Sequence, residues 1–214
     1  MNNSFKYIFF DLDGTLVASA LGIVNSFKYA LEKMDMTIPT DEILMTFVGP
    51  PLDQSFRFCG VDEAEIDRAI ELYRENYIPR GMYEAYIFEG IENVLKTLKE
   101  NGKSLIVTTS KVEHLAEKVL ADHNISKYFD FICGSDVELT RNSKAKVIEY
   151  AFERANISNR DEVIIVGDTK YDIIGAKETG IKSIGVLYGY GSNDELKDAD
   201  YIAEKSSDIL SILL

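Results

Sequence analysis

Two aspartates one residue apart, Asp11 and Asp13, follow a short apolar run near the start of the chain. The run from Tyr7 to Phe10 has the composition of a strand that is buried on both faces. Side chains alternate along a strand, so the two carboxylates leave on the same side, and Gly14 then allows a sharp turn. Because two adjacent buried acids repel each other, this arrangement indicates either a cation between them or a catalytic role.

A second pair of acids follows another apolar run. Residues 163–166 read Val-Ile-Ile-Val and lead through Gly167 into Asp168, and Asp172 comes four residues later. This spacing is about one turn of a helix, so both carboxylates can face the same point. An ordinary acidic turn would explain either pair alone. The repetition at the ends of two buried strands favours a shared site.

Hydroxyl groups and a lysine lie between the two acid pairs. An apolar strand expected at residues 104–109 ends in hydroxyls that include Thr109 and Ser110, and we expect a helix from Lys111 with Ser110 as its N-cap. Lys144 lies at the start of a later helix, where a positive charge opposes the helix dipole. Each feature is weak alone. Their order along the chain, acid pair, hydroxyl, lysine and acid pair, is much more specific.

In this order of motifs the chain resembles the haloacid dehalogenase superfamily of phosphotransferases. The resemblance covers essentially the whole chain, and residues 47–52 and 77–84 carry a narrower likeness to phosphoglycolate-phosphatase-type and nucleotidase-like phosphatases. The four signature motifs of the superfamily match Asp11-Leu-Asp13-Gly-Thr15, Thr109, Lys144 and Gly167-Asp168-Thr-Lys-Tyr-Asp172.

The resemblance implies hydrolysis of small phosphate monoesters through a phosphorylated aspartate. It makes Asp11 the nucleophile, and it makes Asp13 the acid that protonates the leaving oxygen and later activates water. Thr109 is expected to bond a phosphate oxygen, with Ser110 beside it, and Lys144 is expected to offset the negative charge around the phosphate. The expected enzyme is therefore a phosphoric monoester hydrolase that acts on a small phosphorylated metabolite.

Mg²⁺ is the cofactor that these residues and the resemblance together indicate. Magnesium is a hard cation that prefers oxygen ligands. The oxygens expected to serve it are the carboxylates of Asp11 and Asp168 and the backbone carbonyl of Asp13. Asp172 is expected to support the metal site from a greater distance.

From residue 90 onward, short apolar runs alternate with helical stretches. This alternation predicts an α/β fold with a Rossmann-like, mostly parallel sheet that helices cover on both faces, and the strand near 7–12 joins the same sheet. Ligands of such sheets bind beyond the carboxyl ends of the strands, where the acids lie. The expected helices are 91–101, 111–122, 143–155, 170–179 and one from Ser206, and the expected strands are 104–109, 130–133, 162–167, 182–187 and about 200–203.

The segment between the first strand and this alternating region shows the helical spacing of apolar residues. It is predicted to form an all-helical insertion, which matches the small cap of the family. The expected division is a catalytic core of residues 1–16 and 90–214 and a cap of residues 17–89. By resemblance, a cap loop at Gly49 and the nearby Arg57 are expected to contact the substrate and influence specificity.

The composition indicates which binding partners and which cellular compartment to expect. The chain has 214 residues, a net charge of −13 and 46% apolar residues, so we expect a globular protein that avoids nucleic acids and anionic membranes. No apolar run approaches the roughly 20 residues of a membrane span, and the N-terminus shows no signal-peptide pattern. Cys59 and Cys133 lack metal-ligand spacing and indicate free thiols in a reducing cytosol. We expect a cytoplasmic monomer or weak dimer.

Several related activities stay open at this level. A sugar-phosphate mutase similar to β-phosphoglucomutase shares all four motifs, and a phosphonate-cleaving relative would need a cap lysine such as Lys28 or Lys33. A hydrolytic dehalogenase is opposed by Asp13. A receiver-like signalling module also forms a phosphoaspartate, but the helical insertion and the chain length oppose it. Phosphoglycolate, nucleoside monophosphates and sugar phosphates are all candidate substrates.

Overall fold

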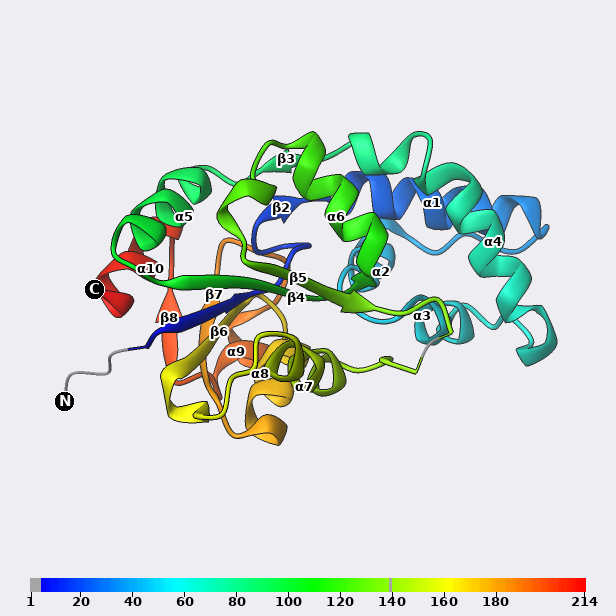
Figure 1. Cartoon of the computed structure of the whole chain (residues 1–214). Coiled ribbons are helices and arrows are strands. Elements are labelled where there is room, and N and C mark those ends of the chain that lie inside the picture. The colour runs from blue at the N-terminus through cyan, green and yellow to red at the C-terminus, as the bar shows by residue number, and fades with distance from the viewer. Residues whose placement is uncertain (1–4, 139) are drawn as a thin grey trace. The chain divides into compact units, whose positions relative to one another are not determined.

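The computed structural model describes residues 5–138 and 140–214 of the chain. Its contacts divide the chain into two compact units, one formed by Met1–Val17 with Ile87–Leu214 and the other by Ala18–Tyr86. The larger unit is thus built from two separate segments, and the smaller unit is an insertion between them (Figure 1). The roles of catalytic core and cap for these units stay predictions. No helix in the described residues has the length and apolar character needed to cross a membrane.

The larger unit contains a six-stranded sheet in the order β5-β4-β1-β6-β7-β8, and the neighbouring strands pair in parallel. This confirms the predicted α/β fold with a parallel sheet. After β1, the next two strands of the sheet, β4 and β5, add on one side of it, and β6, β7 and β8 then add on the other side. Ligands of open α/β sheets bind beyond the carboxyl ends of the strands at the point where the strand order reverses in this way. The strands are β1 Tyr7–Phe10, β4 Ser104–Val112, β5 Phe131–Ser135, β6 Val163–Gly167, β7 Lys182–Val186 and β8 Tyr201–Ala203.

Helices cover both faces of this sheet. α5 packs against α10 on one face, and α7 packs against α8 on the other (Figure 1). The helices of the larger unit are α5 Ile91–Glu100, α6 Glu113–Asp122, α7 Lys144–Arg154, α8 Lys170–Thr179, α9 Asn193–Leu196 and α10 Ser206–Leu213, with 3₁₀ turns at Ser126–Tyr128 and Arg160–Glu162. The expected helices form close to their predicted bounds, and the short α9 was not predicted.

The register of the central strands sets the position of the site. Residues 7–10 of β1 pair with residues 104–107 of β4 on one side and with residues 163–166 of β6 on the other. The chain segments that leave β1 and β6 therefore begin side by side. Core packing holds this register, because a slip of one residue would turn buried side chains toward the opposite face. Phe9, for example, packs edge-on against Phe152 of α7 with a centroid separation of 5.6 Å.

β4 extends farther than the sequence predicted. The strand continues to Val112, and α6 begins at Glu113 instead of Lys111, so Ser110 does not cap the helix as expected. The pairing of β4 with β5 shifts toward its end. Gly134 of β5 permits the close approach of the strands, because a Cβ there would lie 2.5 Å from the Lys111 carbonyl oxygen. The extension keeps Lys111 within the strand and beyond the level at which β1 ends.

The smaller unit consists mainly of helices, and α1 packs against α4 within it. Its helices are α1 Ala20–Lys33, α2 Asp41–Met45, α3 Leu52–Phe58 and α4 Ile66–Tyr77, with 3₁₀ turns at Glu63–Glu65 and Gly81–Tyr83. Two short strands pair at the points where the chain passes between the units, β2 Val17–Ala18 and β3 Tyr86–Ile87.

Aromatic side chains form the core of the smaller unit. Phe27 of α1 is fully buried, and its ring centroid lies 5.1 Å from that of Phe47, 4.9 Å from that of Phe56 and 5.0 Å from that of Tyr73. Tilted aromatic pairs at these separations stabilise a core beyond the area that they bury. These four aromatic residues therefore serve packing.

We expect Phe27→Ala to lower the free energy of unfolding of this unit by about 3–5 kcal/mol, because the substitution removes a buried ring that has aromatic contacts on several sides. Leu21→Ala on the same helix is the control, since that side chain is 63% exposed. Its loss should stay within about 0.5 kcal/mol. Urea unfolding followed by circular dichroism measures both values, and equal losses would contradict the assignment of Phe27 to the core.

Candidate active site

Three carboxylates meet beyond the carboxyl ends of the central strands. Asp11 is the first residue after β1, Asp168 is the first residue after β6, and Asp172 lies in the first turn of α8. Carboxylate oxygens of the three residues lie within 4.8 Å of one another, and all three residues are buried. The shared register of β1 and β6 brings the first two together, and one turn of helix brings the third back to them.

Lys144 provides positive charge within this cluster. Its ammonium nitrogen lies 2.8 Å from Asp11 Oδ1 and 2.8 Å from Asp172 Oδ1, and it donates a hydrogen bond of 3.0 Å to the Thr108 carbonyl oxygen. Gly175 of α8 leaves room for the lysine stem, because a Cβ at Gly175 would lie 2.7 Å from Lys144 Cγ. The carboxylates of Asp11 and Asp172 thus compensate the positive charge of Lys144, which is unfavourable at the N-terminus of α7 because it opposes the helix dipole.

Hydrogen bonds hold other carboxylate oxygens of the cluster in place. Asp168 Oδ1 accepts a hydrogen bond from the Thr15 hydroxyl at 3.1 Å, and its Oδ2 accepts one from the Tyr190 amide at 2.9 Å. Asp172 Oδ2 accepts hydrogen bonds from both the amide and the hydroxyl of Thr169, each at 3.1 Å, and so caps α8. The position of Asp172 is therefore fixed by the start of its own helix.

Asp13 lies apart from this cluster and pairs with Lys111. Lys111 Nζ and Asp13 Oδ2 are 3.0 Å apart, and the two side chains are 8% and 11% exposed. Sequence reasoning missed Lys111 as a residue of the site, because it assigned this lysine to the start of a helix. The signal that could have found it is its place directly after the hydroxyl residues of a buried strand.

The hydroxyl residues lie on β4 before this lysine. Thr109 is buried, and its Oγ1 accepts a hydrogen bond from the Lys111 amide at 3.2 Å, which leaves the hydroxyl proton for another acceptor. Thr108 is also buried, and its Oγ1 has no hydrogen-bond partner within the described part of the chain. Ser110 is half-buried. The role of Thr109 as the phosphate-binding hydroxyl stays a prediction.

Two of the predicted substrate contacts, Gly49 and Arg57, lie in the smaller unit. The Arg57 guanidinium forms ion pairs with Glu63, at 2.8 Å, and with Asp53. Much of the donor capacity of this arginine is thus occupied within its own unit. Contact of either residue with the substrate stays a prediction.

Burial raises the pKa values of two acids of the cluster, Asp11 and Asp168. It raises the pKa of Asp11 to about 7, although the neighbouring Lys144 lowers that pKa, and the charge of Asp172 raises it further. Burial also raises the pKa of Asp168 well above its ordinary value, and Asp172 and Asp11 add to this effect. Burial lowers the pKa of Lys144, but the two carboxylates beside it outweigh burial and hold that pKa above its ordinary value. One ammonium group therefore does not compensate three buried carboxylates.

The cluster fits a metal ion. The ligand atoms that it offers are all carboxylate oxygens. Asp11 Oδ1 and Asp172 Oδ1 accept no hydrogen bond of normal geometry within the described residues, although the Lys144 ammonium lies near both. A divalent cation would supply the missing positive charge and reduce the repulsion among the acids. Sites made only of oxygen suit hard cations.

Comparison with known proteins identifies the family. Residues 8–186 match the model of the haloacid dehalogenase-like hydrolases. The chain belongs to this family. It is 36% identical over 191 residues to the 5'-nucleotidase of Pseudomonas aeruginosa, a match that covers 89% of this chain and 86% of that protein. It is 34% identical over 206 residues to the tyrosine-protein kinase PtkA of Mycobacterium tuberculosis, which covers 96% of this chain and 68% of that protein.

Similarity to solved structures agrees with membership of this family. A crystal structure described as a predicted phosphatase from Clostridium acetobutylicum has a TM-score of 0.92 and 42% identity to this haloacid dehalogenase-like hydrolase, and the match covers 98% of both chains. The prediction of a phosphoric monoester hydrolase is confirmed at the level of the family and its phosphatase relatives.

Gly14 is a sensitive position in this haloacid dehalogenase-like hydrolase, because its φ is +86° and a Cβ there would collide with the Asp168 carboxylate. We expect Gly14→Ala to lower the free energy of unfolding by about 3 kcal/mol, of which about 1 kcal/mol is left-handed strain and the rest is overpacking. Gly102→Ala is the matched control, since its φ is +74° and, apart from its chain neighbours, no atom of the described residues lies within 4 Å of the added Cβ. The control should lose only the part of the stability that left-handed strain accounts for, about 1 kcal/mol. Equal losses in urea unfolding would contradict the close contact at Gly14.

Proposed function

We propose that this protein is a Mg²⁺-dependent phosphatase that hydrolyses small phosphate monoesters through an aspartyl-phosphate intermediate on Asp11. The observation that carries the proposal is the pairing of buried Asp11 with Lys144 inside an acid cluster at the end of the central strand. Phosphate esters resist attack, because the nucleophile meets negatively charged oxygens. Catalysis therefore needs a fixed nucleophile and concentrated positive charge, and this site offers both when a cation is bound.

Two aspartates carry the covalent steps of the proposed reaction. A carboxylate oxygen of Asp11 forms a bond to phosphorus while the bond from phosphorus to the leaving oxygen breaks in line with it. By family resemblance, Asp13 gives its proton to that oxygen, which leaves as a neutral alcohol. Asp13, now a carboxylate, takes a proton from the water that attacks the phosphoryl group. The bond between phosphorus and the Asp11 oxygen then breaks, which releases phosphate and restores the free carboxylate.

Lys144, Thr109 and Ser110 assist both steps in this proposal. The Lys144 ammonium lies beside the nucleophile and offsets the charge that builds up around the transferred phosphoryl group. Thr109 donates its hydroxyl proton to a phosphate oxygen, and Ser110 lies next to it on the same strand. Burial strengthens each of these contacts, because the local dielectric constant is lower than that of water.

Mg²⁺ is held in this proposal by the carboxylates of Asp11 and Asp168 and by the backbone carbonyl of Asp13. When bound, the ion supplies positive charge that neutralises phosphate oxygens. Asp172 supports the site indirectly. Its two carboxylate oxygens already contact Lys144 and the start of α8, which favours this secondary role.

The proposed substrate is a small phosphorylated metabolite such as phosphoglycolate or a nucleoside monophosphate. The 5'-nucleotidase of Pseudomonas aeruginosa among the relatives supports the second class. We further propose that the smaller unit is a cap whose Gly49 loop and Arg57 determine the ranking of substrates, and that the protein is a cytoplasmic monomer or weak dimer. A sugar-phosphate mutase would instead yield an isomeric ester, so phosphorus NMR of the products separates the two activities.

Asp11→Asn is expected to lower kcat/KM by roughly a thousandfold or more for every ester, because it removes the nucleophile. A panel of phosphate monoesters with Mg²⁺, assayed for released phosphate, measures the loss. Asp198→Asn is the control, since this aspartate forms an exposed ion pair with Lys177, and its rates should match those of the wild type. Retained turnover of Asp11→Asn in independent preparations would falsify the nucleophile assignment.

Mg²⁺ should raise the melting temperature of the protein, because it binds the folded acid cluster and not the dispersed acids of the unfolded chain. At one hundred times the dissociation constant, the added stability is about 2.7 kcal/mol. Asp168→Asn should remove most of this shift, whereas Asp198→Asn should keep it. Chelation should also stop hydrolysis, and added Mg²⁺ should restore it. Full activity after exhaustive chelation, or an unchanged thermal shift in Asp168→Asn, would overturn the metal assignment.

A further inference from the structure

The buried ion pair between Lys111 and Asp13 lies outside the acid cluster, and Lys111 has no part in the steps given above. We infer that Lys111 is a positioning residue, which holds the Asp13 carboxyl group in place to protonate the leaving oxygen. This inference rests on the proposed phosphatase reaction, because it concerns a step of that reaction.

The buried charges of the site fall into two groups. Lys144 lies 2.8 Å from each of Asp11 and Asp172, whereas Lys111 lies 3.0 Å from Asp13. A buried carboxylate without a cation is strongly unfavourable, and Lys144 already serves two acids. A second lysine therefore allows Asp13 to stay near the nucleophile while its carboxyl group remains outside the cluster of Asp11, Asp168 and Asp172.

Lys111 contacts two groups that the proposed reaction uses. Its ammonium nitrogen lies 3.0 Å from Asp13 Oδ2, and its backbone amide donates a hydrogen bond to Thr109 Oγ1 at 3.2 Å. Thr109 is the acceptor in that bond, so its own proton stays available for a phosphate oxygen. One residue thus orients the proton donor with its side chain and the phosphate-binding hydroxyl with its main chain.

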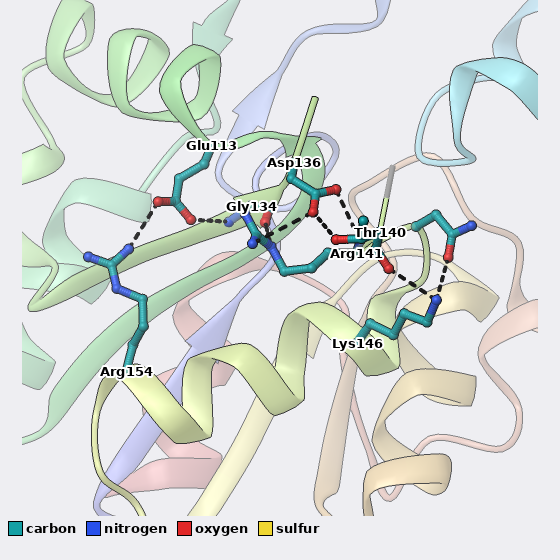
Figure 2. A network of polar contacts seen from close by, with 8 residues as sticks. Glu113, Gly134, Asp136, Thr140, Arg141, Lys146 and Arg154 are labelled. Carbon is teal, nitrogen blue, oxygen red and sulfur yellow. Dashed lines mark hydrogen bonds and ion pairs between the residues drawn. The ribbon is translucent and has the colours of Figure 1, made fainter. Parts of the chain in front are cut away.

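A network of polar contacts fixes the backbone that follows Lys111 (Figure 2). The Glu113 carboxylate accepts hydrogen bonds from the Gly134 amide at 3.2 Å and from the Arg154 guanidinium at 3.0 Å. Arg154 also donates to the Ile132 carbonyl oxygen at 3.0 Å. These bonds tie the junction of β4 and α6 to β5 and α7. Lys111 therefore extends from a backbone that is held firmly, which a residue that positions an acid–base group requires.

The step that depends on this contact is proton transfer to the leaving oxygen. As Asp11 bonds to phosphorus and the ester bond breaks, the proton of Asp13 passes to the departing oxygen. The ammonium beside Asp13 Oδ2 stabilises the carboxylate that remains and restricts rotation of the carboxyl group. Esters of aliphatic alcohols need this proton, because alkoxides are poor leaving groups. Esters of acidic phenols, such as p-nitrophenol, depend on it far less.

The test compares Lys111→Met with the wild type on two esters, p-nitrophenyl phosphate and the fastest aliphatic ester of the panel. The quantity compared is kcat/KM, because it reports the steps up to release of the alcohol and excludes later hydrolysis of the phosphoaspartate. We expect a loss of roughly 10- to 100-fold for the aliphatic ester and less than about threefold for the aryl ester. Lys111→Arg, which keeps the charge, should recover most of the aliphatic activity. Lys118→Met is the matched control, since that lysine forms an exposed pair with Asp122, and it should change neither value.

A double-mutant cycle shows whether the effect passes through Asp13. In the Asp13→Asn background, measured with enzyme in excess, Lys111→Met should change the aliphatic rate by less than about twofold, because the proton donor is already absent. A loss that is the same for both esters, or that persists in the Asp13→Asn background, would refute the inference and make Lys111 a structural residue or a direct phosphate ligand. If circular dichroism shows that Lys111→Met is unfolded, Lys111→Gln takes its place in the same comparison.

The two proposals fail in different ways. Wild-type protein that hydrolyses neither ester with Mg²⁺ refutes the proposed phosphatase and the role of Lys111 with it. Wild-type protein that hydrolyses both esters, combined with an ester-independent loss in the Lys111 variants, refutes only the role of Lys111.

Discussion

The structure depends on the compensation of negative charge that is buried at the ends of the central strands. Asp11 and Asp172 share the ammonium of Lys144 at 2.8 Å each, and three different elements must be in place before that contact can form. Removal of one partner from such a buried pair leaves a charge that costs several kcal/mol. The contacts proposed for catalysis are therefore also contacts that the fold itself requires.

Close approach of the backbone makes this compensation geometrically feasible. Gly175 lets α8 reach the stem of Lys144, and Gly167 leaves space for the Asp172 carboxylate, which a Cβ would meet. Gly134 brings β5 against the end of β4 in the same way. Long charged side chains can reach across such contacts only where the neighbouring residue is small. Glycines at positions 175 and 167 thus leave the space that the Lys144 stem and the Asp172 carboxylate occupy.

The sequence indicated one edge of the sheet for the acids because Asp11 and Asp168 each follow an apolar run. An apolar run that leads into an acid indicates the end of a buried strand, and parallel strands end at the same edge of the sheet. That Asp11 and Asp168 meet depends in addition on the pairing of β1 with β6. The surroundings of Lys111 depend on long-range pairing. Whether the chain continues as a strand after Ser110 is decided by the register with β5 and by Gly134, and neither can be read from residues near Lys111.

The order in which the chain is synthesised gives the insertion a further consequence. The first strand emerges from the ribosome early, but its two neighbours in the sheet begin only at Ser104 and Val163. The unit of residues 18–86 has its own aromatic core, and the short strands at its two ends pair with each other. When this unit folds, it replaces a long flexible loop by a closed structure and lowers the entropy lost when β1 meets β4. The folded insertion thereby shortens the flexible connection between β1 and the later strands with which β1 pairs.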